Sequence, residues 1–143
     1  MDDIRWLDGG DDLHEAFAIR LEVFCDEQGY SPEMELDELD RTSRHVLLYR
    51  GDEPVATGRL YEKRPGVMGI GRLAVRRAWR GTGMGGELLD AMVKKAAQLG
   101  AQWAELDAQC RVIGFYEKQG FAVCGEEHMD GHVPHRMMRR KLG

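Results

Sequence analysis

Short apolar segments, separated by glycine and proline turns, recur along the chain. Segments of this length that are rich in branched and aromatic residues are typical of β-strands. We expect strands at 4–7, 44–50, 55–61, 67–75, 103–108, 121–126 and 135–142, the last two paired as a hairpin with a long connection. Because a glycine inside a strand often marks a bulge, Gly69 and Gly71 are the expected bulge positions in segment 67–75.

Three other segments carry apolar residues at helical spacing. We expect helices at 12–26, at 87–99 and at 112–119. Asp11 or Asp12 suits the cap position before the first helix. Gly100 and Gly120 follow the other two helices, where a glycine in the left-handed conformation commonly ends a helix.

The expected elements follow the order β-α-β-β-β-α-β-α-β-β, which predicts an α/β fold. We expect a mixed sheet of about six to seven strands with helices on both faces. The 143 residues suit one domain, spanning 1–143. The chain shows no secretion signal and no apolar run of membrane-spanning length, and its 3 cysteines form no C-x-x-C pair. A cytoplasmic protein without disulfides is therefore expected.

Charge is distributed unevenly along the chain. The 20 Lys and Arg against 25 Asp and Glu give a net charge of −5, which argues against a nucleic-acid partner. Residues 26–40 include seven acids and no Lys or Arg, and Pro32 predicts a loop there with at most one short helical turn. Arg72, Arg76, Arg77 and Arg80 form a stretch without acids. We expect this basic stretch to favour a phosphate-rich ligand, and charge reversal at Arg76 and Arg77 to weaken its binding.

The basic stretch ends in a glycine-rich loop, Arg80-Gly81-Thr82-Gly83-Met84-Gly85-Gly86, which opens the second expected helix. Glycines let backbone N–H groups approach an anion closely, and the helix dipole adds positive potential at the same point. The loop lacks the lysine of a Walker A motif, and it follows several strands instead of the first one, unlike a dinucleotide-binding fingerprint. A simple helix cap remains the alternative reading of these glycines.

Arg80-x-x-Gly83-x-Gly85 between a strand and a helix resembles the acetyl-CoA motif Q/R-x-x-G-x-G/A of the GNAT N-acetyltransferase superfamily. The downstream Gly114-Phe115-Tyr116-Glu117-Lys118-Gln119-Gly120-Phe121, which follows Leu106-Asp107-Ala108-Gln109, resembles a second signature of that superfamily. Arg20-x-x-Val23-Phe24-x-x-Glu27-Gln28, Glu35-x-Asp37-x-x-Asp40 and Val133-Pro134-His135 are similar to small bacterial ElaA-like members. Together with the element order, the resemblance covers nearly the whole chain.

The resemblance implies acetyl-CoA as donor and a primary amine of a small molecule or peptide as acceptor, with direct attack in a ternary complex. Cofactor-binding residues would be Leu73, Ala74, Val75, Arg80, Gly81, Thr82, Gly83, Met84, Gly85, Gly86 and Gln109. Tyr116 matches the position of the general acid, with simple packing on the sheet as its alternative role. A non-catalytic acyl-CoA-binding or sensing module on the same fold is the alternative function.

Amine acylation also needs a proton acceptor, because an alkylamine is protonated at neutral pH. No single base stands out: Asp107 lies on the strand beside the expected cleft, Glu35, Asp37 and Asp40 lie in the acidic segment, and a chain of water molecules is the alternative. Arg59 and Arg72 lie on neighbouring expected strands. They could face the acceptor, but pairing with the loop acids is the more common outcome for such residues.

The remaining polar residues favour no other chemistry. His128, His132 and His135 with Cys124 do not have the spacing of a zinc site, and we expect no metal. Cys110 is expected to be a small residue of the cleft, and Met137 and Met138 to pack within a strand. Neither a nucleic-acid nor a membrane partner is expected, while pairing of the last strand makes a homodimer possible.

Overall fold

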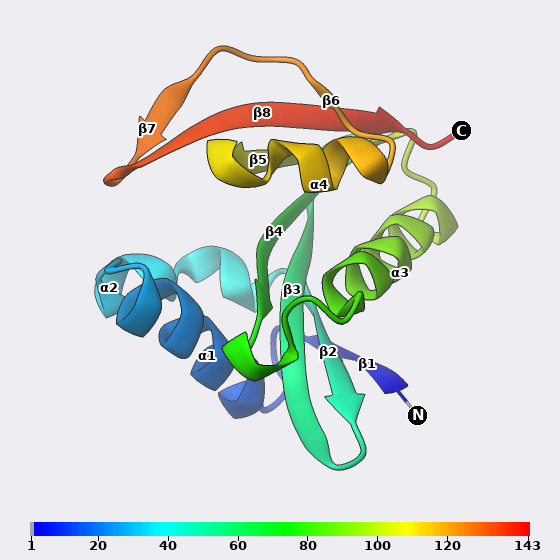
Figure 1. The fold of residues 1–143 in the computed structure, drawn as a ribbon. Helices are drawn as coiled ribbons and strands as arrows, with labels where there is room; N and C mark the ends of the chain where they lie inside the picture. Colours follow the sequence, from blue (N-terminus) through cyan, green and yellow to red (C-terminus); the bar gives the residue numbers. More distant parts are fainter. Residues whose placement is uncertain (1) are drawn as a thin grey trace.

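The computed structural model describes residues 2–143, and its eight strands form one mixed sheet (Figure 1). The strands are β1 (Asp2–Asp8), β2 (Arg44–Arg50), β3 (Glu53–Arg64), β4 (Val67–Val75), β5 (Trp103–Gln109), β6 (Ala122–Val123), β7 (His128–Asp130) and β8 (Val133–Lys141). Their order is β1-β2-β3-β4-β5-β8-β6, and β7 pairs with β8 beyond that path. Only the β4–β5 pair is parallel, as its connection through a helix requires.

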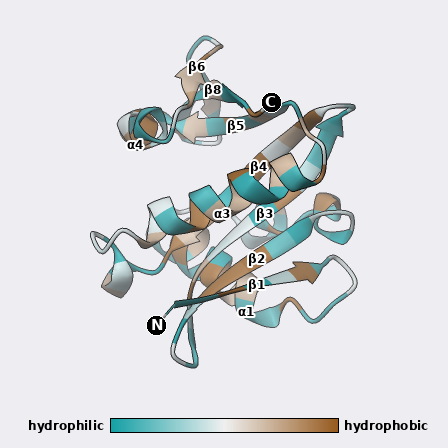
Figure 2. Ribbon diagram, turned by 90° about the vertical axis from the view of Figure 1, so that its right-hand side faces the viewer, coloured by the Kyte–Doolittle hydropathy of each residue, from teal (hydrophilic) through white to brown (hydrophobic). Residues whose placement is uncertain are grey.

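The helical segments are α1 (His14–Arg20), the π-helix η1 (Leu21–Glu27), α2 (Pro32–Glu35), the 3-10 turns η2 (Glu38–Arg41), η3 (Arg77–Trp79) and η4 (Cys110–Val112), α3 (Met84–Gln98) and α4 (Ile113–Lys118). Helices cover both faces of the sheet, because successive strand residues point to opposite sides. Val46 and Leu48 of β2 belong to the core beneath α3, whereas Leu47 and Tyr49 pack in the core beneath α1. Figure 2 shows α3 in front of the central strands and α1 behind them.

The predicted fold class is confirmed, and several local predictions need correction. β7 was not expected, since all three of its residues are exposed and show no one-sided pattern. Leu13 precedes the first turn of α1, so neither aspartate is its cap, although the Asp12 carboxylate accepts the His14 N–H at 3.1 Å. The acidic segment holds two short helical turns, and Pro32 begins α2 because a proline fits the first helical position.

The central strands β4 and β5 separate along their length. Their pairing covers only Val67–Ile70 against Trp103–Leu106, and β4 then continues beside β3 alone. Between Gly71 and Ala74 one extra residue enters β4, with Arg72 at φ +51°. This non-glycine bulge turns β4 away from β5. In Figure 1, β5 and β8 run across the upper part of the molecule while β3 and β4 run downward.

The prediction of bulges at Gly69 and Gly71 was wrong. Gly69 pairs regularly with Tyr61, and Gly71 pairs regularly with Arg59 just before the extra residue. Gly69 serves another purpose, because the Tyr61 ring lies against its backbone. A Cβ at position 69 would come within 2.3 Å of that ring. The glycine therefore allows a close contact across the strand pair.

A buried ionic network ties the acidic segment to the sheet. We call it the arginine–carboxylate cluster, formed by Arg20, Glu35, Asp37, Asp40, Arg59 and Arg72. Arg20 is 1% exposed and reaches Glu35 at 3.0 Å and Asp40 at 2.7 Å. The expected pairing of Arg59 and Arg72 with the loop acids is confirmed, at 2.6 Å from Arg59 to Asp37 and 2.8 Å from Arg72 to Glu35.

The two most buried acids of the cluster, Glu35 and Asp40, have pKa values shifted in opposite directions. Burial raises the pKa of the Glu35 carboxyl above its usual range, and the attraction of Arg72 and Arg20 does not cancel that effect. Burial acts in the same direction on Asp40, but the hydrogen bonds and charge of Arg20 and the contact with Arg59 outweigh it. The net effect is a lowered pKa for Asp40.

Two further properties concern the chain as a whole. Among residues 2–143, no helix has both the length and the apolar composition needed to cross a lipid bilayer. Cys25, Cys110 and Cys124 are free thiols.

Replacement of Arg20 by alanine should lower the free energy of unfolding by about 3–5 kcal/mol, because the buried carboxylates of Glu35 and Asp40 each lose one of their two arginine partners. Chemical denaturation followed by circular dichroism measures the change. Lys94→Ala is the control, since its exposed pair with Asp90 on α3 contributes less than about 0.5 kcal/mol. Equal, small effects of the two substitutions would contradict the structural role of Arg20.

Candidate active site

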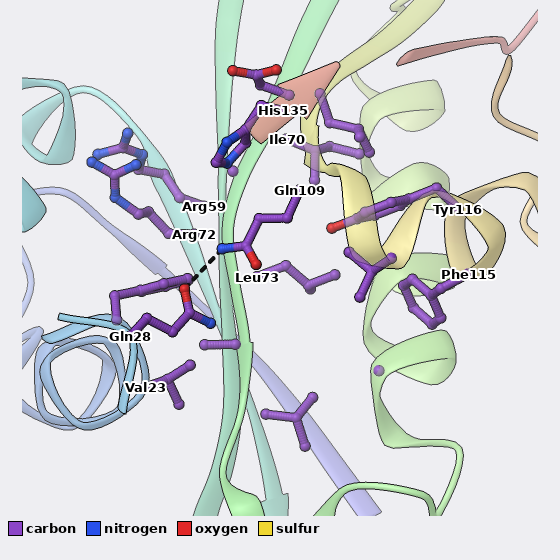
Figure 3. A pocket seen from close by; sticks show the side chains of 18 of the residues that line it. Val23, Gln28, Arg59, Ile70, Arg72, Leu73, Gln109, Phe115, Tyr116 and His135 are labelled. Atoms are coloured by element: carbon purple, nitrogen blue, oxygen red, sulfur yellow. Dashed lines mark hydrogen bonds between the residues drawn. The ribbon is translucent and has the colours of Figure 1, made fainter. Parts of the chain in front are cut away.

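The separation of β4 and β5 opens a cavity of about 830 Å³ (Figure 3). A volume of this size is typical of small-molecule sites. Nine of the predicted cofactor-binding residues line it: Leu73, Ala74, Val75, Arg80, Gly81, Gly83, Met84, Gly85 and Gln109. Thr82 and Gly86 belong to the same loop but are not among the lining residues. Tyr116 and Asp107, the two predicted catalytic residues, line the cavity as well.

The glycine-rich loop forms one end of the cavity. Gly81 and Gly83 have φ of +78° and +85°, a left-handed conformation that residues with a Cβ adopt at a cost. Gly83 is the N-cap of α3, and the first intrahelical bond runs from the Glu87 N–H to its carbonyl. The backbone N–H groups at the start of α3 therefore have no partner within the helix. They form a site of positive potential that suits a phosphate group.

The Arg80 side chain links this loop to η1 and to the end of β4. Its guanidinium bonds Glu27 of η1 at 2.7 Å and 3.0 Å and donates to the Val75 carbonyl at 2.8 Å. Arg80 therefore fixes the position of the loop relative to the end of β4. The paired Glu27 has a lowered carboxyl pKa, chiefly because of the hydrogen bond from Arg80.

The expected basic stretch is largely neutralised by acids from other elements. Arg76 bonds Glu22 at 3.1 Å, and Arg72 is held in the arginine–carboxylate cluster. Arg77 is the most exposed of the four and lies 3.5 Å from Glu27. Sequence reasoning missed Arg111, which lines the cavity from η4, because it lies outside the stretch that precedes the loop.

Tyr116 reaches the cavity from α4. Its ring makes edge contacts with Phe115 and Phe121, at centroid distances of 5.1 Å and 6.1 Å. Figure 3 shows its hydroxyl pointing towards β4, into the opening. Burial raises the pKa of the Tyr116 phenol to about 12, so the group is fully protonated at neutral pH. Phe115 is partly buried and packs against the core beneath α3.

Two side chains at the end of β5 make contacts that were not expected. The Asp107 carboxylate lies 2.8 Å from His128 Nε2 of β7, and this contact raises the imidazole pKa of His128. The Gln109 amide donates to the Gln28 side chain of the N-terminal helical segment at 2.8 Å, shown as the dashed line in Figure 3. The role of Asp107 as a base stays a prediction, and its carboxylate already contacts the His128 imidazole.

The β7–β8 hairpin closes the other end of the cavity. Tyr30 donates its hydroxyl proton to the Asp130 carbonyl at 3.0 Å, and His132 Nε2 lies 2.6 Å from the Gln28 carbonyl. Tyr30, Asp130 and His135 all line the cavity. No local pattern could place these residues together, because Tyr30 and Asp130 are 100 positions apart. Of these three lining residues, only His135 belongs to a motif noted in the sequence, Val133-Pro134-His135, which resembles ElaA-like members.

The described residues give no indication of a metal site. Among residues 2–143, no three His, Cys, Asp or Glu side chains are arranged to hold a metal ion. The three histidines of the C-terminal hairpin instead contact a carboxylate or backbone carbonyls. Cys110 lies beside the cavity-lining residues of η4, with its Sγ 3.6 Å from Glu127.

A cavity between two separated central strands, with a glycine-rich helix start at one end, is the arrangement of an acyltransferase that binds an acyl-CoA. The family described as acetyltransferase (GNAT) domain matches residues 12–142. The Bacillus subtilis protein named uncharacterized N-acetyltransferase YjcF is 38% identical over 129 residues, which cover 90% of this chain and 91% of that protein.

Solved structures agree with this relationship. Escherichia coli ElaA superposes with a TM-score of 0.88 at 28% identity, covering 98% of this chain and 99% of that one. An acyl-CoA N-acyltransferase from Pseudomonas aeruginosa gives 0.87 at 27% identity, with the same coverage. The chain belongs to the GNAT acetyltransferase family and is an N-acetyltransferase. The resemblance to ElaA-like members is confirmed, and the enzyme is the supported choice over a sensing module.

Substitution of Gly83 by alanine should raise the dissociation constant of acetyl-CoA at least about tenfold. The left-handed backbone costs about 1–2 kcal/mol with a Cβ, so the loop shifts and its N–H groups no longer converge. Isothermal titration calorimetry measures the binding. Gly10→Ala is the control, because a Cβ there meets nothing within 4 Å and its φ is not positive. Binding by the Gly83 variant that equals wild type would refute this role of the loop.

Proposed function

We propose that the protein transfers the acetyl group of acetyl-CoA to a primary amine by direct attack within a ternary complex. One observation carries the proposal. A single cavity joins the free N–H groups of the glycine-rich loop to the Tyr116 hydroxyl and to the polar residues of the β7–β8 hairpin. Donor and acceptor can therefore occupy its two ends at the same time, and no covalent enzyme intermediate is needed.

The chain's own backbone suits the donor. The N–H groups at the start of α3 would bind the pyrophosphate, and Leu73, Ala74 and Val75 would align the pantetheine arm. Arg76 donates its N–H to the Val55 carbonyl of β3 at 2.9 Å. Because N–H groups alternate along a strand, that of Val75 points away from β3 towards the opening. It is a candidate to stabilise negative charge on the thioester oxygen.

Tyr116 is the proposed general acid. Its phenol remains protonated at neutral pH, with its pKa raised to about 12 by burial, and it lies in the wall opposite β4. A protonated group in this position can give its proton to the departing thiolate of coenzyme A. The edge contacts with Phe115 and Phe121 fix the direction of the ring.

The acceptor would enter at the end of the cavity formed by Tyr30, Glu35, Tyr61 and the β7–β8 hairpin. Calorimetry with acetyl-CoA, NAD and ATP tests the donor, and micromolar binding of acetyl-CoA alone is expected. A panel of propylamine, 1,4-diaminobutane, 2-phenylethylamine and phenylalanine then tests the acceptor by release of free coenzyme A. Absence of acetyl-CoA binding, or binding without transfer to any amine, would overturn the proposal.

Tyr116→Phe should lower kcat by about 10²-fold or more, because the thiolate then leaves without its proton donor. The dissociation constant of acetyl-CoA should stay within about twofold of wild type. Since the phenol has a pKa of about 12, the wild type should lose no activity from its ionisation below about pH 11. Steady-state kinetics across pH measures both effects.

Tyr49→Phe is a matched control for that substitution. Burial raises the Tyr49 pKa to about 12 as well, but this phenol bonds Glu15 on the opposite face of the sheet. Its removal should leave kcat unchanged. Equal kcat of Tyr116→Phe and wild type at every pH would remove Tyr116 from the mechanism.

A further inference from the structure

The acceptor end of the cavity contains one histidine whose two ring nitrogens have different surroundings. His135 is 5% exposed and lines the cavity from β8. Its Nδ1 lies 2.9 Å from the Val133 carbonyl, which can only accept a hydrogen bond. Nδ1 therefore carries the proton, and the lone pair of the neutral ring is on Nε2. No hydrogen bond within residues 2–143 occupies Nε2.

One carboxylate faces that nitrogen. Asp130 Oδ2 lies 3.9 Å from His135 Nε2, and the Asp130 side chain is 49% exposed. The backbone carbonyl of Asp130 accepts the Tyr30 hydroxyl at 3.0 Å, which holds β7 in place without using the carboxylate. The carboxylate is therefore available to a ligand beside a basic nitrogen.

The other charged groups at this end are already paired. Arg59 bonds Asp37 and Asp40, Arg72 bonds Glu35, and Asp107 bonds His128. The remaining Nε of Arg59 is buried and has no hydrogen-bond partner among the described residues. Among residues 2–143, the other charged or titratable groups that line the cavity are Tyr30, Glu35, Arg59, Tyr61, Arg72, Arg80, Asp107, Arg111, Tyr116 and Asp130. The His128 ring lies beside the lining, with its centroid 6.2 Å from that of His135. Of the three carboxylates that line the cavity, those of Glu35 and Asp107 are hydrogen-bonded to basic side chains, and that of Asp130 is left for an acceptor.

We propose that Asp130 binds the acceptor as an ammonium ion and that His135 Nε2 takes its proton. The proposal rests on the acetyl-transfer function proposed above and extends it to the base and to the acceptor class. That class is a primary alkylammonium without a neighbouring carboxylate, because the Asp130 carboxylate would repel one and the guanidinium groups of Arg59 and Arg72 are paired with acids. Figure 3 shows His135 at the same opening as Gln109 and the Tyr116 hydroxyl.

The proton transfers of the proposed reaction balance over one catalytic cycle. The ammonium gives one proton to His135 Nε2, and the imidazolium then faces the Asp130 carboxylate. The neutral amine forms a C–N bond with the acetyl carbonyl carbon, and the C–S bond breaks with its electron pair going to sulfur. The Tyr116 hydroxyl protonates that sulfur, and the resulting phenolate takes a proton from the positively charged nitrogen of the new C–N bond, which leaves a neutral amide. His135 releases its proton to solvent before the next cycle.

His135→Asn tests the base, because the asparagine amide can still donate to the Val133 carbonyl while the Nε2 lone pair is lost. The panel amine with the highest kcat/KM serves as substrate. Wild-type kcat/KM should fall on the acid side, because a protonated base cannot take the proton of the ammonium. In the variant this limb should be replaced by a rise of about tenfold per pH unit towards the amine pKa near ~10. The loss should be about 10²-fold or more at pH 7 and should nearly vanish at pH 10.

Two further variants and one substrate pair complete the experiment. Asp130→Asn should raise KM for the amine about tenfold or more with kcat within about threefold, as expected for a lost charge pair of roughly 1.4 kcal/mol. Phenylalanine, which is 2-phenylethylamine with an added carboxylate, should be acetylated at least about tenfold less efficiently. His14→Asn is the control, since this exposed histidine contacts Asp12 at the start of α1.

The outcomes separate this inference from the proposed function. If the wild type acetylates an amine and His135→Asn keeps the wild-type pH profile, the inference is overturned and the acetyl-transfer function stands. If Asp107→Asn removes the acid limb and His135→Asn does not, Asp107 is the base and the inference is again overturned. If the wild type acetylates no amine, both proposals are overturned together.

Discussion

The cavity depends on the backbone conformation of one residue. Arg72 lies at φ +51°, a region that a residue with a Cβ occupies at a cost of about 1–2 kcal/mol. Its guanidinium contacts Glu35 at 2.8 Å and Asp37 at 3.2 Å, and these contacts oppose relaxation of the strand. The extra residue in β4 turns the strand away from β5 after Ile70, and the opening that results is lined by both strands. Strain in β4 and the ion pairs that hold it are thus parts of the same site.

The acidic segment has a structural role that its charge alone does not reveal. Seven acids within residues 26–40 suggest a surface that attracts cations. The structure turns Glu35 and Asp40 inward to Arg20, while Asp37 meets Arg59 and Arg72. Because these charges are matched inside the fold, they are not available to a substrate. The negative charge that remains at the acceptor end comes from Asp130 of the hairpin.

The two ends of the cavity are built in different ways. The donor end comes from one continuous stretch, from the end of β4 through the glycine-rich loop to α3. The acceptor end combines the segment after η1, the central strands and the β7–β8 hairpin. Contacts such as Tyr30 with Asp130 and Gln28 with Gln109 join these distant parts over the opening. The proposed acceptor end therefore depends on contacts between distant segments, whereas the proposed donor end depends on one local loop.

The sequence by itself determined seven of the eight described strands, the main helices and the glycine-rich loop, because each rests on a pattern within a few neighbouring residues. It indicated Tyr116 through a motif resemblance. It also indicated that Arg59 and Arg72 pair with the loop acids. Only the tertiary structure decided which residues come together at the proposed acceptor end of the cavity. Gln109 pairs with His135 through the β5–β8 register, and Asp130 meets Tyr30 across 100 positions. The bulge fell on Arg72 and not on a glycine, since ion pairs from another segment hold it there. Such contacts depend on how distant segments pack, and the local spacing of apolar residues does not predict that packing.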